Sequence, residues 1–346
     1  MNTTNHKIYY SNATKMKKIK NDSIDLIVTS PPYPMIEMWD SIFSKQNNKI
    51  ENALKHKNDR VAFELMHEEL DKVWKESFRI LKNGGIACIN IGNATRSINQ
   101  NFALYPNHSR ILNYCFNIGF NILPYIIWRK QTNAPTKFMG SGMLPVGAYV
   151  TLEHEYILIL RKGKRKIFAN EKIKQLRRES SFFWEERNIW FSDTWTDIKG
   201  TQQTISDKKS RNRSGAFPIN LAYQLINMFS IQGDIVLDPF LGTGTTSIAA
   251  AISQRNSIGI EIDKKMKNII ENYFNGSISI SKNINEKRIK NHNLFVQKRL
   301  NQKKQLKYFN KNFNFSVMTR SEVYLSFKNI KTIEKNKESF IVNYEN

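Results

Sequence analysis

Short apolar runs bounded by turn residues recur along the first 260 residues of the chain. They lie at residues 24–28, 86–91, 125–128, 156–160, 235–237 and 257–260, and each predicts a strand buried on both faces. Apolar residues also recur at helical spacing, from Leu70 to Leu81 and from Ala222 to Phe229, and we expect residues 83–85 to end the first of these helices. Strands that alternate with helices predict an α/β fold with a doubly wound, mostly parallel sheet, whose ligands bind at the carboxyl ends of the strands.

The composition changes twice along the chain. Residues 161–213 are rich in basic and aromatic side chains and break the alternation, so we expect an inserted module at residues 163–212. Beyond residue 263 asparagine and lysine dominate, although scattered apolar residues argue against simple disorder. We therefore divide the chain into residues 1–162, 163–212, 213–275 and 276–346, the last being a basic extension rich in Asn and Lys.

The charge of the chain narrows the class of partner. Its 346 residues carry 53 Lys and Arg against 30 Asp and Glu, a formal net charge of +23, which suits nucleic acid or an anionic membrane. No run approaches the roughly 18 to 20 apolar residues of a membrane span, and the first residues lack an apolar signal core, so we expect a cytoplasmic protein that faces nucleic acid. Cys88 and Cys115 match neither disulfide nor metal-ligand spacing, so no metal centre is expected.

A strand, a glycine-rich turn and an alanine-rich helix follow one another at residues 236–252. Gly242 and Gly244 let the backbone approach a ligand closely, and the exposed helix N-terminus favours a carboxylate. Glu261 follows about 20 residues later, where an acid often holds ribose hydroxyls. The turn alone is also consistent with an ordinary connection or with a nicotinamide-dependent oxidoreductase, but Ser247 replaces the third glycine of the dinucleotide fingerprint. Together with Glu261, the turn predicts a nucleoside ligand.

The strand at residues 24–28 leads through Thr29 into the tetrapeptide Ser30-Pro31-Pro32-Tyr33. Each proline fixes its own φ and pushes the preceding residue toward extended geometry, so this corner is stiff. A hydroxyl, fixed carbonyls and an aromatic face suit a planar base extruded from a duplex. Taken alone, the tetrapeptide favours a polyproline-like loop with a core tyrosine over such a site.

Five motifs in one order resemble those of the DNA amino-methyltransferases, which use S-adenosylmethionine to methylate exocyclic amines of bases. They are the segments 29–33, 79–85, 153–162, 214–218 and 238–246. The resemblance spans residues 7 to about 265 and implies a seven-stranded, Rossmann-like sheet. Because the catalytic motif precedes the cofactor loop, the chain resembles the permuted β subgroup. Residues 1–162 would then be the catalytic half, 163–212 the target-recognition insert and 213–275 the cofactor-binding half.

The resemblance implies a role for each motif residue. The catalytic residues would be Ser30, Pro31, Pro32 and Tyr33. The S-adenosylmethionine contacts would be Asn12, Thr29, Phe217, Pro218, Asp238, Pro239, Phe240, Gly242, Gly244, Thr245, Thr246 and Glu261. The family often has Asp at the position of Asn12, whose amide oxygen can still accept a hydrogen bond. The two phenylalanines are equally consistent with ordinary core packing.

The residue that begins the catalytic motif bears on the target base. Family members acting on cytosine N4 usually carry Ser there and those acting on adenine N6 usually carry Asp, so Ser30 favours cytosine and leaves adenine as the alternative. The resemblance implies a site-specific enzyme that acts on double-stranded DNA. It is either part of a restriction-modification system, with a cognate restriction endonuclease as partner, or a solitary relative. A DNA-binding protein with a degenerate cofactor pocket is a third hypothesis. Catalysis requires the segments 29–33 and 238–246 to meet at neighbouring strand ends.

Sequence reading by the insert would use basic residues interleaved with aromatic ones. The predicted DNA contacts are Lys164, Arg165, Lys166, Arg177, Arg178, Arg187, Lys208, Lys209, Arg211 and Arg213. Trp184, Trp190 and Trp195 lie among them, and for at least two of these a small core is the favoured interpretation. We also expect residues 45–57 to form a polar loop, either closing over DNA or simply solvated.

Overall fold

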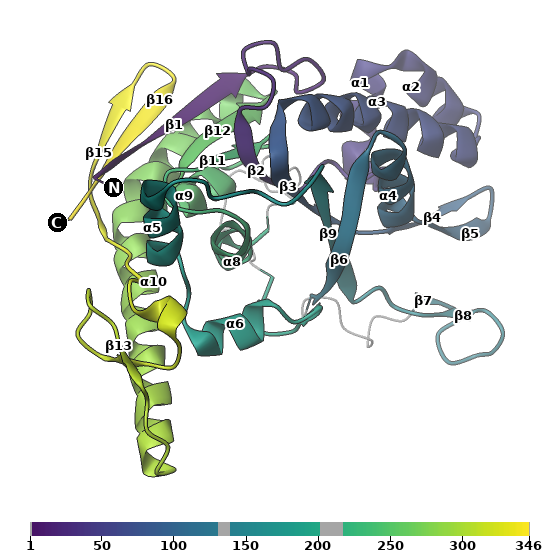
Figure 1. The fold of residues 1–346 in the computed structure, drawn as a ribbon. Coiled ribbons are helices and arrows are strands. Elements are labelled where there is room, and N and C mark those ends of the chain that lie inside the picture. The colour runs from purple at the N-terminus through teal and green to yellow at the C-terminus, as the bar shows by residue number, and fades with distance from the viewer. Residues whose placement is uncertain (1, 131–138, 201–216, 346) are drawn as a thin grey trace.

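The computed structural model describes residues 2–130, 139–200 and 217–345, and its centre is a ten-stranded sheet. In spatial order the strands are β10 (Thr194–Trp195), β6 (Phe120–Arg129), β9 (His154–Lys162), β3 (Leu81–Ile91), β2 (Ile24–Thr29), β11 (Ile235–Asp238), β12 (Asn256–Glu261), β1 (Thr3–Tyr10), β16 (Ser339–Tyr344) and β15 (Ile330–Asn336). The seven from β6 to β1 form the predicted core, in which β9 runs antiparallel to the rest. Strand β10 extends one edge, and β16 and β15 extend the other (Figure 1).

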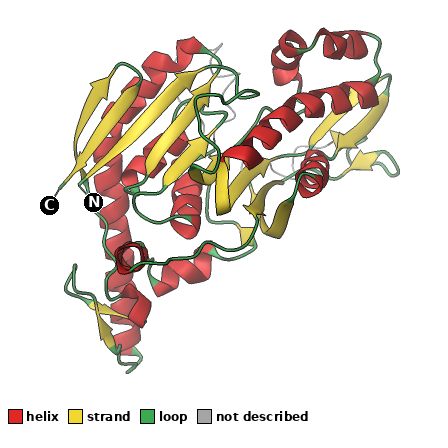
Figure 2. Ribbon diagram, turned by 45° about the horizontal axis from the view of Figure 1, so that its top comes forward, coloured by secondary structure: helices red, strands yellow, loops and turns green. Residues whose placement is uncertain are grey.

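Helices cover both faces of this sheet (Figure 2). They are α1 (Asp40–Gln46), α2 (Asn48–Lys55), α3 (Asp59–Ile80), α4 (Asn107–Asn117), α5 (Glu171–Glu179), α6 (Trp184–Trp190), α8 (Ile219–Phe229), α9 (Thr245–Ile252) and α10 (Lys267–Asn301). All six residues of β2 are buried, since Leu26 and Val28 pack with α8 and α9 on one face and Ile27 packs with α3 on the other. Burial on both faces is the physical reason for the continuous apolar runs.

Shorter elements complete the fold. They are the hairpins β4 (Ala94–Ile98) with β5 (Asn101–Tyr105), β7 (Met139–Gly140) with β8 (Ala148–Tyr149) and β13 (Tyr308–Phe309) with β14 (Ser316–Val317), and the 3-10 turns η1 (Glu37–Trp39), η2 (Lys264–Met266) and η3 (Arg320–Glu322). Among the residues that the structure describes, no helix combines the length and the apolar character needed to cross a membrane.

Every predicted strand is present with longer bounds, but two local predictions are wrong. Helix α3 ends at Ile80, and residues 83–85 lie inside β3 instead of separating the helix from the strand. Residues 45–57 are not a loop, because they contain the end of α1 and the whole of α2. Ile50 and Ala53 recur at helical spacing and are buried in the core that α3 also lines, which the polar composition of the segment concealed.

The C-terminal extension is built into the main fold. Helix α10 runs without a break through the expected boundary at residue 275 and continues past the sheet (Figure 1). Strands β15 and β16 then return to the sheet, where Phe340 and Val342 are buried in the same core as α9. Trp190 and Trp195 also belong to that core, so their burial is confirmed, but they pack in the main core and not in a separate small core of the insert.

Candidate active site

The sheet topology brings the predicted functional segments together at one end of the strands. Strands β1, β2, β3, β11 and β12 are parallel, so their carboxyl ends lie side by side there. Strand β9 is antiparallel to β3 and begins there, and β6 ends there, because Arg129 pairs with His154. The catalytic motif, the glycine turn, Glu261 and the start of β9 therefore surround the same opening.

A cavity of about 1440 Å³ lies at the carboxyl ends of these strands. Sites for one small ligand typically measure roughly 300–1,000 Å³, so the volume suits two ligands side by side. Predicted residues that line it are Asn12, Ser30, Pro31, Pro32, Tyr33, Phe217, Asp238, Pro239, Phe240, Gly242, Thr245, Thr246 and Glu261. The other three lie next to it in the chain or in space: Thr29 ends β2, Pro218 precedes α8 and Gly244 precedes α9.

One buried carboxylate ties the two motifs together. Asp238 ends β11, and its Oδ1 accepts from the Thr29 hydroxyl at 2.6 Å and from the Phe240 amide at 3.0 Å. Its Oδ2 accepts from the Thr246 hydroxyl at 2.6 Å. Burial raises the pKa of Asp238 to about 6, against the opposing effect of these hydrogen bonds. The prediction that segments 29–33 and 238–246 meet at neighbouring strand ends is therefore confirmed.

The glycine turn has the geometry that its sequence predicts. Gly242 and Gly244 adopt φ values of +56° and +94°, which residues with a Cβ rarely adopt. The Gly242 amide donates to Glu261 Oε2 at 2.8 Å, and the Asp263 amide donates to Oε1 at 2.7 Å. Burial raises the pKa of Glu261 although these amides oppose it. A Cβ at Gly242 would meet only the Phe240 carbonyl at 4.0 Å, so the turn presents bare backbone to a ligand.

The remaining predicted cofactor residues divide into exposed and packed ones. The Asn12 side chain accepts from the Thr14 amide at 2.9 Å and stays exposed at the cavity rim. Phe217 is buried in the core and also lines the cavity. Phe240 meets Trp74 edge to face, with ring centroids 6.1 Å apart, and also lines the cavity. Both phenylalanines thus pack against the core and also form part of the cavity wall.

Tyr33, the predicted catalytic tyrosine, is held through its hydroxyl by residues to which the motifs assigned no role. Tyr33 donates to Glu155 Oε2 at 2.9 Å and accepts from Asn90 Nδ2 at 2.9 Å, and Ser30 Oγ lies 3.2 Å from its oxygen. Burial, and then the charge of Glu155, raises the pKa of Tyr33 well above its usual value. Lys130 forms an ion pair with Glu155. Asn90 and Glu155 could have been noticed as polar side chains within apolar strands, which need a partner there.

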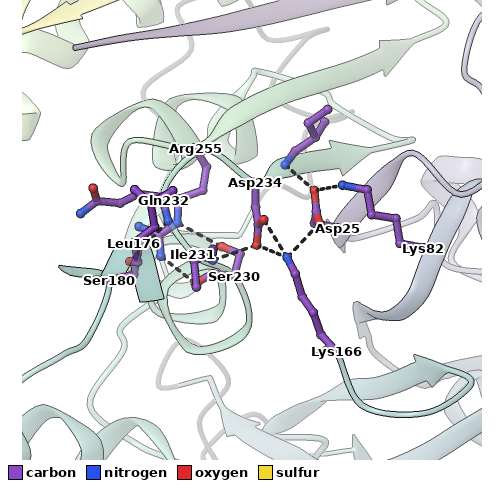
Figure 3. A network of polar contacts seen from close by, with 12 residues as sticks. Asp25, Lys82, Lys166, Leu176, Ser180, Ser230, Ile231, Gln232, Asp234 and Arg255 are labelled. Atoms are coloured by element: carbon purple, nitrogen blue, oxygen red, sulfur yellow. Dashed lines mark hydrogen bonds and ion pairs between the residues drawn. The ribbon is translucent and has the colours of Figure 1, made fainter. Parts of the chain in front are cut away.

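The first basic cluster of the insert, residues 164–166, lies at the opposite ends of the strands from the cavity. Strand β9 has nine residues, so at roughly 3.3 Å per residue its end is about 26 Å from its start. The Lys166 ammonium beyond that end bonds Asp25 Oδ1 at 2.9 Å and Asp234 Oδ1 at 2.7 Å (Figure 3). These contacts join the starts of β2 and β11. Lys164, Arg165 and Lys166 therefore lie far from the cavity, and Lys166 stabilises the sheet through its two carboxylate partners. Their assignment as DNA contacts stays a prediction.

The other predicted DNA contacts fall into two groups. Arg177 and Arg178 are exposed on α5, and Arg187 is exposed on α6. Lys208, Lys209, Arg211 and Arg213 lie outside the described residues. Lysines that line the cavity, which the sequence did not single out, are Lys15, Lys45, Lys72, Lys75, Lys130 and Lys265. Within the described ranges, no group of three His, Cys, Asp or Glu side chains is arranged to hold a metal ion.

Comparisons with known proteins agree with this site. Residues 24–272 match a family model described as DNA methylase. The Type II methyltransferase M.MthZI of Methanothermobacter thermautotrophicus is 53% identical over 320 residues, which are 92% of this chain and 89% of that protein. M.MjaI of Methanocaldococcus jannaschii, also a Type II methyltransferase, is 51% identical over 280 residues, or 78% of this chain and 91% of that protein.

A solved structure extends the likeness to the fold. TTHA0409 of Thermus thermophilus, crystallised with S-adenosyl-L-methionine, matches with a TM-score of 0.62 and 29% identity, covering 79% of this chain and 94% of that one. The family model covers both the catalytic motif and the glycine turn, which share one cavity here. The chain belongs to the N6 and N4 DNA methylase family and is a DNA methyltransferase.

Proposed function

We propose that the protein transfers a methyl group from S-adenosylmethionine to the N4 amine of a cytosine that is flipped out of double-stranded DNA at a specific site. The observation that carries this proposal is Ser30, a neutral hydroxyl at the head of the catalytic motif in the cavity that the glycine turn also lines. The permuted enzymes that this chain resembles usually place Asp there when the target is adenine.

The residues around the glycine turn fit S-adenosylmethionine. Bare backbone at Gly242 and the N-terminus of α9 suit its carboxylate, and Glu261 at the cavity wall suits its ribose hydroxyls. Phe217 and Phe240 supply apolar surface for the adenine ring, and Asn12 supplies an amide at the rim. When bound, this group supplies an electrophilic sulfonium methyl.

The chain's own contribution to the chemistry is positioning. The Ser30 hydroxyl and the Pro31 carbonyl accept hydrogen bonds from the target amine and turn its lone pair out of conjugation with the ring. Neither group needs to be a strong base, because the amine becomes acidic once it carries the extra substituent. Tyr33 stacks on the base, and such stacking, worth roughly 1–3 kcal/mol, offsets part of the cost of unstacking it from the duplex.

DNA binding draws on the positive charge of the chain. The net charge of +23 and the cavity lysines favour the phosphate backbone and predict salt-sensitive affinity. Arg177, Arg178 and Arg187, with the basic residues at 208–213, are the proposed contacts of the target-recognition region. Because the relatives M.MthZI and M.MjaI are Type II methyltransferases, we place the protein in a restriction-modification system with a cognate endonuclease.

The test identifies the methylated base directly. Duplex DNA is incubated with the protein and methyl-labelled S-adenosylmethionine, digested to nucleosides and separated by mass spectrometry. We expect label in N4-methylcytosine, and Ser30→Ala should lower the rate about a hundredfold. The control Ser279→Ala, on the exposed surface of α10, should leave the rate unchanged. Label in N6-methyladenine would refute the cytosine assignment in favour of adenine, and absence of label would favour a binding protein.

A further inference from the structure

A polar cluster that includes residues without an assigned role adjoins the predicted catalytic residues. Glu155 comes from β9, Asn90 from β3, Lys130 from the residue after β6 and Tyr33 from the corner after β2. Glu155 and Asn90 are only 8% and 2% exposed. Asn90 Nδ2 donates to Glu155 Oε2 at 2.6 Å, in addition to its bond with Tyr33. Glu155 and Asn90, from strands distant in sequence, thus converge on the Tyr33 hydroxyl, and Lys130 joins the cluster through Glu155.

The hydrogen bonds at Tyr33 have only one consistent set of directions. A phenol hydroxyl has one proton to donate and two lone pairs to accept with. Glu155, as a carboxylate, can only accept, so the Tyr33 proton points to it. Asn90 Nδ2 and the Gly92 backbone amide can only donate, so both use lone pairs of the Tyr33 oxygen and neither can take its proton. Tyr33 therefore has no proton left for Ser30.

The position of the Tyr33 proton decides which residue donates in the 3.2 Å contact between Ser30 and Tyr33. The contact is a hydrogen bond only when Ser30 donates and Tyr33 accepts. The Ser30 proton then points toward Tyr33, and the lone pairs of Ser30 Oγ remain available to accept from another group. An acceptor is what a target N–H requires.

We propose that Glu155 is a positioning residue that, by taking the Tyr33 proton, orients the Ser30 hydroxyl as an acceptor toward the target amine. The inference rests on the proposed function and extends it to Glu155, which is not among the predicted catalytic, cofactor-binding or DNA-binding residues. Glu155 acts through Tyr33 and Ser30 and does not touch the substrate in this account.

The surroundings of Glu155 and Tyr33 keep this arrangement in place. The Lys130 ammonium pairs with Glu155 Oε1, which compensates a carboxylate that would be costly to bury alone. On the other side the Tyr33 ring lies against Gly92, where an added Cβ would come within 2.9 Å of Tyr33 Cε2. The glycine therefore allows the ring to reach the cluster, and the ring has little room to turn away.

The variant Glu155→Met removes the acceptor of the Tyr33 proton and keeps a side chain of similar length. Asn90 Nδ2 still donates to the Tyr33 oxygen, so it cannot take the Tyr33 proton. Ser30 Oγ, 3.2 Å away, is then the acceptor left for that proton. Ser30 loses its orientation as an acceptor for the amine. We expect kcat to fall about tenfold to a hundredfold, with the KM and the dissociation constant for S-adenosylmethionine unchanged.

A double-mutant cycle separates this role from a structural one. Tyr33→Phe keeps the ring and removes the hydroxyl, so the link from Glu155 to Ser30 is already absent and adding Glu155→Met should cost less than twofold in kcat. If Glu155 only braced the β6–β9 hairpin, its substitution would lower kcat by the same factor in both backgrounds. Equal factors, or a kcat of Glu155→Met within twofold of the wild type, would overturn the proposal.

Matched controls complete the experiment. Glu153→Gln, two residues earlier and ion-paired with Arg129 at 3.2 Å, should retain full kcat. Thermal unfolding of each variant, with and without S-adenosylmethionine, verifies that it folds and binds. The wild-type protein is assayed on the same duplex, so absence of N4-methylcytosine in that sample contradicts the proposed function itself. If the wild type forms N4-methylcytosine but the Glu155 substitution lowers kcat by the same factor with and without the Tyr33 hydroxyl, only the positioning role of Glu155 is contradicted.

Discussion

Asp238→Asn is a direct test of the bridge between the catalytic strand and the glycine turn. The Asn side chain keeps an oxygen for the Thr29 hydroxyl and the Phe240 amide. Its NH₂ group faces Thr246, which can accept from it while donating to the Val28 carbonyl 3.4 Å away. The substitution therefore keeps the bridge and removes one buried titratable group.

The magnitude follows from the pKa of Asp238, which burial raises from 3.8 to about 6. A carboxyl group whose pKa is higher in the folded than in the unfolded chain stabilises the fold most below the unfolded value, and that stability is lost as the pH rises through the folded value. The total loss is about 3 kcal/mol, at 1.36 kcal/mol per pKa unit. Of this, about 1 kcal/mol is lost between pH 5 and pH 7.

The assay is urea unfolding of the ligand-free protein at pH 5, 6 and 7. All other titrating groups are common to the two proteins, so the difference in the free energy of unfolding isolates Asp238. Asp238→Asn should gain about 1 kcal/mol relative to wild type between pH 5 and pH 7. A difference that stays constant with pH, or that changes in the opposite direction, would refute the claim that burial dominates at this carboxylate.

Three further outcomes follow from contacts described above. Lys166→Met leaves Asp234 without its ion-pair partner and Asp25 with Lys82 alone, so it should lower the free energy of unfolding by about 3 kcal/mol and leave kcat unchanged, as measured by denaturation and by methyl transfer. His292 is buried, which lowers its pKa, but a hydrogen bond to a carboxylate raises the pKa overall. Its stabilisation should be complete below about pH 6.5 and disappear above the folded pKa, and His292→Gln should abolish that loss in urea unfolding between pH 6 and pH 9. Glu261→Gln should weaken S-adenosylmethionine binding at least tenfold in calorimetric titration, and unchanged affinity would remove Glu261 from the proposed site.

The local sequence was sufficient to predict backbone geometry where that geometry depends only on residues nearby in the chain. The apolar run of β2, the prolines at 31 and 32 and the glycines at 242 and 244 each impose a backbone geometry within a few residues. The same reasoning failed for α2, because polar residues dominate its composition and only Ile50 and Ala53 mark the buried side. It also missed the structural role of Lys166, because the two carboxylates that this lysine joins lie far from it in the sequence.

The sequence by itself determined the strands, the two motif corners and the family, because apolar periodicity and turn chemistry act over short distances. Only the tertiary structure decided which distant residues share a hydrogen bond. It joined Thr29 to Asp238, placed Glu155 and Asn90 on the Tyr33 hydroxyl, and carried Lys164 and Arg165 to the far edge of the sheet. The physical reason is that strand order and direction set these distances, and both result from packing the whole chain around one sheet.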